Sequence, residues 1–256
     1  MERKAKRWQR RLRRRGFSCT VLVQAHSTND EAKALLLRGA PHGAAVLAFS
    51  QTGGRGRLNR EFSSTQGGLY LSFIYKKPMP TQIAALTFTA ALACADAIES
   101  LCSVKVGLKW VNDLYIAGKK VGGILTEGII CPETGEILGA IVGIGINVKN
   151  ELPASLFESA TTLAQKTKRP PYLFELSEAV LARLFEAFEG EVEVPADAYA
   201  KRMLFVGKEV SVFDGKEPYY ATILGIDERG GLCVRTRSGE KRTLIAGEVT
   251  LHQDKS

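Results

Sequence analysis

Hydrophobic and polar residues alternate in short runs between residues 17 and 148, and turn residues such as glycine and proline bound many of these runs. Runs of this kind are typical of β-strands. They cover Phe17–Ala25, Ala44–Phe49, Gly68–Tyr75, Val106–Trp110, Asp113–Ile116, Lys120–Glu127 and Ile137–Val148. Two longer segments, Ile83–Leu101 and Phe174–Phe188, place apolar residues at helical spacing. The pattern predicts an α+β fold in which helices pack on a mixed β-sheet.

A helix start follows the first predicted strand. Thr28-Asn29-Asp30-Glu31 matches the capping box, in which a threonine and a residue three positions later satisfy the first backbone N–H groups of a helix. The short helix that it opens continues through Leu35–Leu37. Ser27 and Asn29 are therefore predicted at a corner between a strand and a helix.

The pattern of hydrophobic and polar residues changes after residue 204. Short β-rich runs alternate there with glycine, aspartate and serine turns, at the spacing of a small barrel. They are Glu209–Phe213, Tyr220–Ile226, Leu232–Thr236 and Lys241–Ile245. We predict a basic tail over residues 1–16, a catalytic domain over 17–200 and a small C-terminal β-barrel over 201–256.

The composition, with 45% hydrophobic and 24% charged residues, is that of a globular protein. The five cysteines include no CxxC pair, so they suggest neither a zinc cluster nor a disulfide framework. No uninterrupted apolar run approaches the roughly 20 residues of a membrane-spanning helix. We expect a cytoplasmic protein with no membrane partner.

Charge is concentrated at the N-terminus. Nine of the lysines and arginines lie in residues 1–16, against the single acid Glu2, so this segment accounts for the formal net charge of +8. Sixteen residues are too few for a helix-turn-helix module, and specific DNA binding is therefore not expected. Two interpretations stay open, a polyanion-binding tail and a solvated charge run.

The loop between the second and third predicted strands carries Gly53-Gly54-Arg55-Gly56-Arg57, and Arg60 follows closely. Glycines let the backbone approach a ligand, and guanidinium groups bind carboxylates and phosphates. The motif predicts an anion-binding loop that becomes ordered when an anion neutralises it. A surface hairpin with solvated arginines is the alternative, because a motif this short also arises by chance.

Two further motifs carry candidate chemistry. Lys109-Trp110-Val111-Asn112-Asp113 ends one predicted strand, and Lys120 follows seven residues after Asp113, so that a hairpin would bring both to one end of the sheet. Lys120 offers a compact charge to a phosphate, whereas a surface ion pair with Asp113 is the alternative. The strand Val142–Val148 has glycines in its interior, which favours close approach of a ligand or another backbone, and Asn147 ends it with an amide.

With these elements in this order, the chain resembles the biotin–protein ligases over about residues 17–251. The motifs that carry the resemblance are Gly54–Phe62, Lys109–Asp113, Lys119–Leu125, Gly143–Asn147 and Gly247–Leu251. Asn59, Phe62 and Val111 stand where the family usually has glycine, tryptophan and proline. We expect Asn59 to tolerate a positive φ, Phe62 to remain an apolar anchor and Val111 to keep an extended backbone. The form expected is one without the family's N-terminal DNA-binding domain.

The resemblance implies a biotin/lipoate ligase-like catalytic domain and an SH3-like C-terminal barrel. It also implies the site residues. The biotin pocket would contain Ser27, Thr28, Asn29, Gln51, Arg55, Gly56, Arg57, Lys120, Gly123 and Gly143, with Ser27 and Gln51 on the ureido ring. ATP and the adenylate would meet Arg57, Arg60, Lys109, Asn112, Asp113, Lys120 and Asn147. Lys120, Arg57 and Arg55 would be catalytic, and Asp113 would meet magnesium through the phosphates.

The activity that the resemblance implies has two halves. Biotin and ATP would form biotinyl-adenylate and pyrophosphate, and biotin would then pass to a lysine of a biotin carboxyl carrier protein. The expected substrates and cofactors are thus biotin, ATP and Mg²⁺, and a homodimer is left open.

Three other functions compete with this interpretation. A lipoate or octanoate ligase would share the fold, but Gln51 and the glycine-arginine loop favour biotin. A biotin-responsive repressor would need an N-terminal winged helix, whereas only sixteen residues precede the first predicted strand. A non-catalytic binding module is disfavoured because Arg57, Asp113 and Lys120 are retained.

Overall fold

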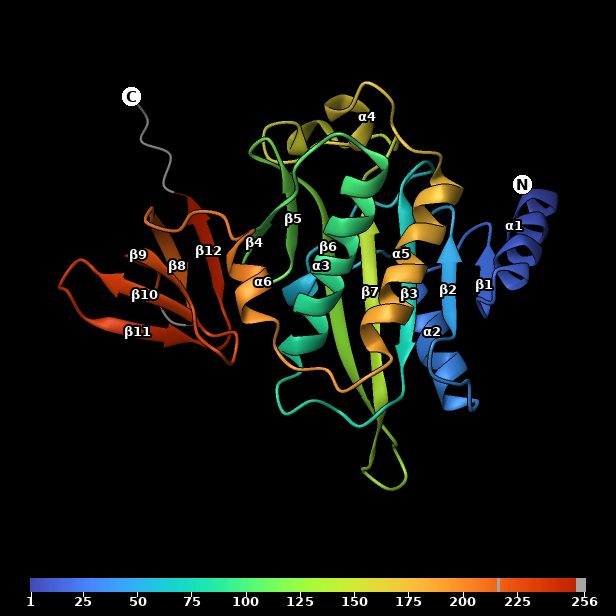
Figure 1. The fold of residues 1–256 in the computed structure, drawn as a ribbon, viewed down its shortest axis with the longest axis horizontal. Coiled ribbons are helices and arrows are strands. Elements are labelled where there is room, and N and C mark those ends of the chain that lie inside the picture. The colour runs from blue at the N-terminus through green and yellow to red at the C-terminus, as the bar shows by residue number, and fades with distance from the viewer. Residues whose placement is uncertain (216, 252–256) are drawn as a thin grey trace.

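The computed structural model describes residues 1–215 and 217–251, and it consists of a large sheet covered by helices and a smaller C-terminal sheet (Figure 1). The large sheet has seven strands in the order β1-β2-β3-β7-β6-β5-β4. Their bounds are β1 Cys19–Leu22, β2 Ala45–Ala48, β3 Leu69–Tyr75, β4 Gly107–Lys109, β5 Asp113–Ile116, β6 Lys119–Ile130 and β7 Ile137–Ile146. β1 and β2 are parallel and the other pairs antiparallel, which confirms the α+β class with a mixed sheet.

Helices cover both faces of this sheet. The helices are α1 Glu2–Arg14, α2 Thr28–Leu37, α3 Ala84–Leu101, α4 Leu163–Lys166, α5 Leu173–Phe188 and α6 Ala196–Ala200, with 3-10 turns at Arg57–Asn59 and Ala154–Leu156. α3 and α5 pack side by side on one face (Figure 1). α2 covers the other face, where its Ala32 and Leu36 join a separate buried cluster with Val46 and Ile141.

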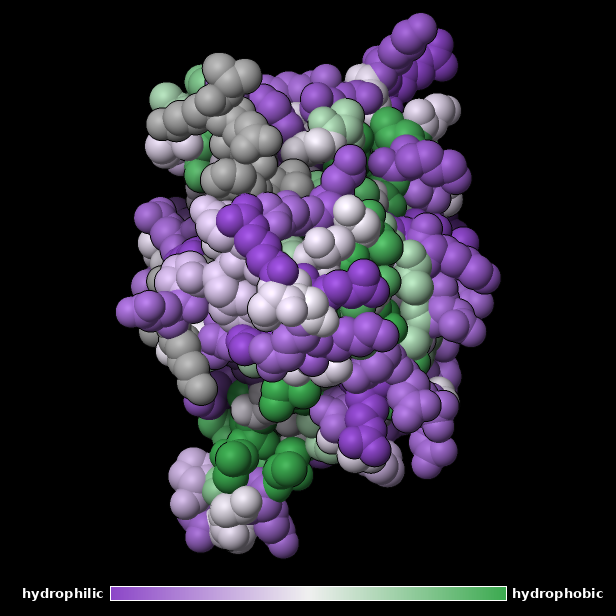
Figure 2. Space-filling view, turned by 90° about the vertical axis from the view of Figure 1, so that its left-hand side faces the viewer, coloured by the Kyte–Doolittle hydropathy of each residue, from purple (hydrophilic) through white to green (hydrophobic). Residues whose placement is uncertain are grey.

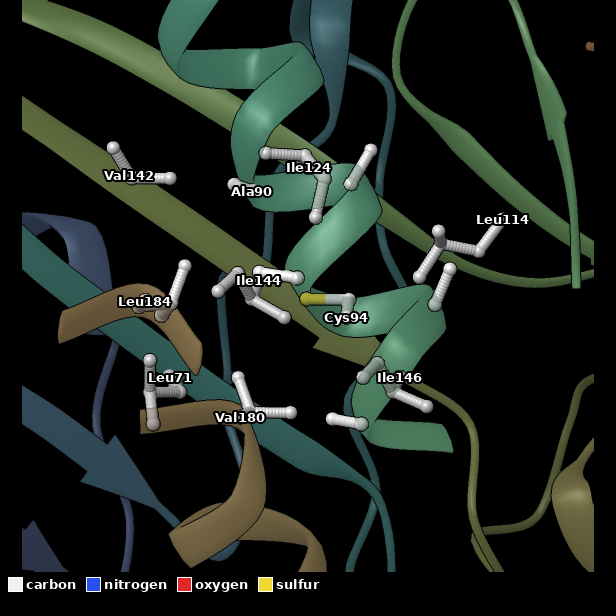
Figure 3. Close-up of a cluster of buried hydrophobic side chains, with 14 of the residues drawn as sticks. Leu71, Ala90, Cys94, Leu114, Ile124, Val142, Ile144, Ile146, Val180 and Leu184 are labelled. Carbon is white, nitrogen blue, oxygen red and sulfur yellow. The ribbon is translucent and has the colours of Figure 1, made fainter. Parts of the chain in front are cut away.

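The period of two residues along β7 divides its side chains between these faces. Val142, Ile144 and Ile146 point toward α3 and α5 and meet side chains such as Cys94 and Val180 (Figure 3). The alternate positions, Gly143 and Gly145, therefore lie on the opposite face. A strand with one apolar face and one glycine face can support a packed core and leave room for other groups behind it.

Helix α3 is long and apolar enough to cross a membrane, judged by its length and composition alone. In this fold 61% of its residues are buried, and it packs against the sheet beside α5. Core helices of globular domains commonly have this composition.

The basic segment 1–16, expected as a tail, forms helix α1 over Glu2–Arg14, and its charged side chains are exposed. Ala5, Trp8 and Leu12 recur at helical spacing and are buried, with exposures of 2, 5 and 0%. The ring of Trp8 packs edge-on against Phe49 and Phe174, at centroid distances of 4.9 and 5.2 Å. Three apolar positions suffice to dock the helix because they fall on one face, although charged residues dominate the segment.

The capping box predicted at Thr28 is also absent. The N-cap of α2 is Ser27, and its side chain makes no capping hydrogen bond. The Thr28 hydroxyl instead donates to Gln51 Oε1 at 3.0 Å. At this helix start the hydroxyl of Thr28 therefore binds the side chain of Gln51 and does not cap the helix.

The C-terminal sheet has five antiparallel strands in the order β11-β10-β9-β8-β12, consistent with the predicted small barrel. The strands are β8 Glu209–Phe213, β9 Tyr219–Ile226, β10 Leu232–Thr236, β11 Lys241–Leu244 and β12 Glu248–Leu251. Its turn before β10 is joined to the large domain by a hydrogen bond of 3.0 Å from Trp110 Nε1 to the carbonyl of Gly230. A Cβ on Gly230 would lie 2.3 Å from the ring of Phe88, so this contact needs glycine.

The surface is mixed in character on the side that the C-terminal sheet faces (Figure 2). Hydrophobic side chains gather at the lower end in this view, where the β6–β7 hairpin projects beyond the sheet. Ile130 and Ile137 of these strands are 59 and 61% exposed.

Candidate functional site

One pocket collects nearly all the predicted site residues on the glycine face of the sheet. It is lined by Ser27, Thr28, Asn29, Gln51, Arg55, Gly56, Arg57, Arg60, Glu61, Phe62, Lys109, Trp110, Asn112, Asp113, Lys120, Gly123, Ile124, Leu125, Gly143, Ile144, Gly145, Gly247, Val249 and Thr250. These residues come from six separate segments of the chain, 27–29, 51–62, 109–113, 120–125, 143–145 and 247–250. The topology brings them together because β5, β6 and β7 are neighbours and the starts of α2 and of the glycine-arginine loop lie against them.

Asn147 is the one predicted site residue that lies apart from this lining. It is 4% exposed, and its side-chain oxygen accepts a hydrogen bond of 3.0 Å from Asn150 Nδ2. It follows the last residue of β7, so its amide closes the turn after the strand instead of facing the pocket.

A continuous polar network forms the inner wall. Ser72 lies within hydrogen-bond distance of both Thr28 Oγ1 and Asn29 Oδ1, at 2.8 and 2.6 Å. Asn29 Nδ2 donates to the carboxylate of Glu127. At the other end, Gln51 Oε1 accepts from the backbone N–H of Thr28 at 2.7 Å. Buried polar groups that satisfy one another in this way hold fixed positions, so the pocket presents a shaped polar surface.

The amide of Gln51 retains hydrogen-bonding capacity toward the pocket. Its oxygen accepts from the N–H and the hydroxyl of Thr28, and one of its two N–H groups donates to Ser64 Oγ at 2.9 Å. Within the described residues, the second N–H has no protein acceptor. It is therefore available to a carbonyl oxygen in the pocket.

The glycine-arginine loop is folded back as a short hairpin. The N–H of Gly56 donates to Arg60 O at 2.7 Å, and Phe62 N–H donates to Gly54 O at 2.9 Å. Gly54 is required by packing, because a Cβ there would lie 2.3 Å from Ser64 Oγ and 2.6 Å from Phe62 O. The hairpin thus holds Arg55, Arg57 and Arg60 along one side of the pocket.

Arg55 is anchored to α2 by a bidentate ion pair. Its two terminal nitrogens lie 3.0 and 2.5 Å from the carboxylate oxygens of Asp30. The Arg55 guanidinium holds the pKa of the Asp30 carboxyl below its ordinary value, chiefly through these hydrogen bonds. Asp30 was not predicted as a site residue, although its place beside Thr28 and Asn29 in the motif was a usable signal.

Lys120 and Asp113 face each other across the β5–β6 hairpin, with Lys120 Nζ 2.6 Å from Asp113 Oδ1. Both side chains are largely buried, at 33 and 17% exposure, and both line the pocket. The two interpretations of the sequence are thus compatible, since the ion pair exists and it lies within the site. The neighbouring Lys119 points elsewhere and donates to the carbonyl of Phe157.

The glycines of β7 make room for side chains of the protein itself. A Cβ on Gly143 would lie 2.2 Å from Asn29 Oδ1, and one on Gly145 would lie 2.6 Å from the ring of Phe62. Gly123 on β6 is less confined, with Asp113 Oδ1 at 3.3 Å. The prediction that other groups approach the backbone of this strand closely is therefore confirmed. The approaching groups are the side chains of Asn29 and Phe62.

The three departures from the family pattern have different structural outcomes. Phe62 lines the pocket and packs edge-on near Tyr70, in agreement with its expected role as an apolar anchor. The peptide bond between Trp110 and Val111 is cis, at the position where the family usually has proline. In the glycine-arginine loop the structure places Leu58, which precedes Asn59, in the left-handed region with φ 53°.

The C-terminal sheet supplies one wall that the sequence did not predict. Gly247, Val249 and Thr250, in and beside β12, line the pocket. The motif Gly247–Leu251 carries part of the resemblance, but the sequence analysis gives it no role in the site. Glu61 and Trp110 are further lining residues that the sequence analysis did not predict, although both lie inside motifs that carry the resemblance.

The charge of the lining suits an anionic ligand. Five lining residues are cationic, namely Arg55, Arg57, Arg60, Lys109 and Lys120, against the two carboxylates Glu61 and Asp113. Among the described residues no cluster of three or more histidine, cysteine, aspartate or glutamate side chains could hold a metal ion by itself. A single carboxylate fits magnesium only where phosphate oxygens supply most of the ligands.

Comparison with known proteins agrees with the fold. Residues 21–147 match the biotin/lipoate A/B protein ligase family, and residues 205–251 match the biotin protein ligase C-terminal domain. The class defined by fold and site is therefore that of the protein ligases that handle biotin or lipoate.

Individual relatives narrow this class. The bifunctional ligase/repressor BirA of Bacillus subtilis is 33% identical over 237 residues, which cover 86% of this chain and 70% of the relative. The biotin–[acetyl-CoA-carboxylase] ligase of Paracoccus denitrificans is 30% identical and is covered over 98% of its length. The solved biotin protein ligase of Aquifex aeolicus in complex with biotin and ATP superposes with a TM-score of 0.79 at 30% identity, covering 93% of this chain and 99% of that one. The chain belongs to the biotin protein ligase family, and it is an enzyme of the ligase class.

Proposed function

We propose that the chain joins biotin to a lysine of a biotin carboxyl carrier protein in two steps, through biotinyl-adenylate. The observation that carries this proposal is the convergence of Arg55, Arg57 and Lys120 on a pocket whose inner wall is a fixed polar network. The cations suit a carboxylate and a phosphate, and the polar wall suits a buried heterocycle.

In the first step an oxygen of the biotin carboxylate attacks the α-phosphorus of ATP. The bond from this phosphorus to the oxygen bridging to the β-phosphate breaks, and pyrophosphate leaves. Both reactants are anions, so their approach is opposed by repulsion. Arg55, Arg57 and Lys120 would offset this repulsion and the charge that builds on the phosphate, and positioning in the pocket would supply the alignment. No nucleophilic residue of the enzyme is needed.

In the second step the neutral amine of the carrier lysine attacks the biotinyl carbonyl. An amide bond forms, the bond from the carbonyl carbon to the phosphate oxygen breaks, and AMP leaves. The amine loses a proton during this step. Arg57 would retain the adenylate until the carrier arrives, because its loop borders the pocket.

The polar wall would select biotin over a linear acyl chain. The free N–H of Gln51 would donate to the ureido carbonyl, and Ser27, Thr28 and Asn29 would lie beside the rings, with backbone groups at Gly56, Gly123 and Gly143. A lipoate or octanoate chain would cover the second N–H of Gln51 without accepting a hydrogen bond from it, which costs about 1–3 kcal/mol. This discrimination argues against the lipoate ligase alternative.

The nucleotide would occupy the side of the pocket formed by Arg60, Lys109, Asn112 and Asp113. Magnesium, held mainly by phosphate oxygens with Asp113 as its protein carboxylate, would supply charge neutralisation when bound. A cytoplasmic location belongs to the same proposal and is supported by the cysteines, all five of which are free in the structure.

Two measurements test this function. A transfer assay with radiolabelled biotin, ATP and a carboxyl-carrier domain should label the carrier and release AMP. A thermal-shift series should show a far larger stabilisation by biotin and ATP together than by either alone, because the tightly held adenylate binds only the folded state. The substrate assignment would be overturned if lipoate with ATP raised the melting temperature and biotin with ATP did not.

A further inference from the structure

Helix α1 presents a dense cationic face that the ligase reaction does not use, since none of its residues lines the pocket. Its lysines and arginines are exposed, whereas Ala5, Trp8 and Leu12 are buried. Lys4 and Arg11 lie over aromatic rings of the docking face, and Arg15, just after the helix, pairs with Glu178. Within the described chain, no ion pair is formed by the remaining basic residues of this segment.

The exposed arginines form a line along the helix. Arg3, Arg7, Arg10 and Arg14 follow one another at intervals of four, three and four residues. At about 100° per residue they lie within an arc of roughly 60°, on the side of the helix opposite Ala5, Trp8 and Leu12. Lys6 and Arg13 flank this line. The 13 residues of α1 extend over about 20 Å at 1.5 Å per residue.

The line is held by the core of the protein. Trp8 packs between Phe49 and Phe174, and Gln9 Oε1 accepts a hydrogen bond of 3.2 Å from the N–H of Val21 on the edge strand β1. The arginines therefore do not lose backbone entropy when a partner binds, as they would on an unstructured tail.

We propose that α1 is a docking surface for the phosphate backbone of duplex nucleic acid, without sequence recognition. Guanidinium groups bind phosphate oxygens in bidentate fashion, and a duplex offers one charge per about 1.7 Å along its axis. A surface about 20 Å long thus faces some six base-pair steps. The exposed line carries no aromatic or amide side chain that could read bases. An anionic membrane is a poorer partner, because the apolar face of α1 is already buried against the protein and cannot insert among lipids.

The test is fluorescence anisotropy of a labelled 20-base-pair duplex of arbitrary sequence, titrated with the full chain at a series of salt concentrations. Each phosphate contact contributes about −0.9 to the slope of log K against log salt concentration. We expect a slope of about −4 for the native chain. The quadruple variant Arg3→Gln, Arg7→Gln, Arg10→Gln and Arg14→Gln should bring the slope close to zero. The double variant Arg7→Gln and Arg10→Gln should remove about half of it.

A matched control removes the same charge elsewhere. Glutamine replaces four exposed arginines that are scattered over the surface, Arg38, Arg169, Arg183 and Arg229. This control should keep the native slope, and carrier biotinylation should be unchanged in every variant, because none of these residues lines the pocket. The proposal is overturned if the control loses as much binding as the α1 variant. Tighter binding to vesicles of 30% phosphatidylserine in phosphatidylcholine than to the duplex would also overturn it, in favour of a membrane partner.

Discussion

Arg55 and Asp30 form a bidentate ion pair that joins the glycine-arginine loop to the first turn of α2. The same guanidinium lines the pocket in which we propose that an anionic substrate binds. Asp30 is therefore a positioning residue for Arg55, since it fixes the guanidinium at the pocket edge before any substrate arrives.

Replacing Asp30 by asparagine should raise the KM for biotin by up to about fivefold and leave kcat nearly unchanged. The size of this expected rise in KM follows from the exposure of the ion pair, because a half-exposed ion pair contributes about 0–1 kcal/mol of interaction free energy. Steady-state kinetics with the carrier as acceptor measures both constants. A large fall in kcat with an unchanged KM would show that Asp30 has a different role.

The same pair has a defined pH dependence. The pKa of Asp30 is lowered in the folded protein, so its contribution to stability is present above the ordinary carboxyl pKa of 3.8 and is lost as the pH falls through the lower, folded value. The difference in melting temperature between the native chain and Asp30→Asn should therefore stay constant from pH 8 to pH 5 and shrink below pH 4. A difference that vanishes at neutral pH would contradict this assignment.

Lys120→Ala should slow adenylate formation by two to three orders of magnitude, since a positioned cation of this kind is worth about 3–4 kcal/mol in the transition state. The melting temperature should change little. Pyrophosphate release in single turnover measures the step directly.

Lys119→Ala is the matched control, because Lys119 is the adjacent residue on β6 but its amine contacts Phe157 O outside the pocket. It should retain nearly the native rate. Similar rates in the two variants, or a failure of presynthesised biotinyl-adenylate to restore transfer in Lys120→Ala, would refute the proposed role.

Arg57→Gly should allow adenylation but release the activated biotin, since the loop loses a cation beside the phosphate. Free adenylate reacts with any accessible lysine. Bystander proteins mixed with the variant, biotin and ATP should therefore become labelled, as detected with streptavidin. If bystander labelling does not rise and carrier labelling is unchanged, Arg57 is a solvated surface residue.

Gly143→Ala should destabilise the protein by about 1–3 kcal/mol and weaken biotin binding, because the new methyl group would overlap Asn29 and disturb its contact with Ser72. Gly128→Ala on the adjacent strand β6 is the control, since its nearest contact is Ile83 at an ordinary 3.4 Å. Denaturant unfolding and biotin titration report the two effects. Equal behaviour of the two variants would show that Gly143 is not confined by the pocket wall.

Much of the two sheets could be predicted because their strands follow short-range rules. β5, β8 and β10 have the predicted bounds, and the helices α3 and α5 begin within one residue of the prediction. Local periodicity sufficed for these elements. It failed for α1, where Ala5, Trp8 and Leu12 are the only signal among nine charged residues and their partners, such as Phe174, lie far away in the sequence.

The sequence predicts those site residues that lie in recognisable motifs. It does not predict those whose position depends on packing between distant parts of the chain. The motif of Asn147 was recognised correctly, but the residue follows the end of β7 and turns toward Asn150. The ion pair of Asp30 with Arg55 depends on a contact across 25 positions. The wall formed by Val249 and Thr250 depends on docking of the C-terminal sheet, which no local pattern encodes.

That wall has a consequence for synthesis of the protein on the ribosome. Ser27 and Thr28 are made more than two hundred residues before Val249 and Thr250, yet all four border the same pocket. A nascent chain can therefore fold its large sheet early and still lack a complete site until β12 has left the exit tunnel. Only a molecule whose C-terminal sheet has docked would therefore hold activated biotin, which reacts with any lysine, in the complete pocket.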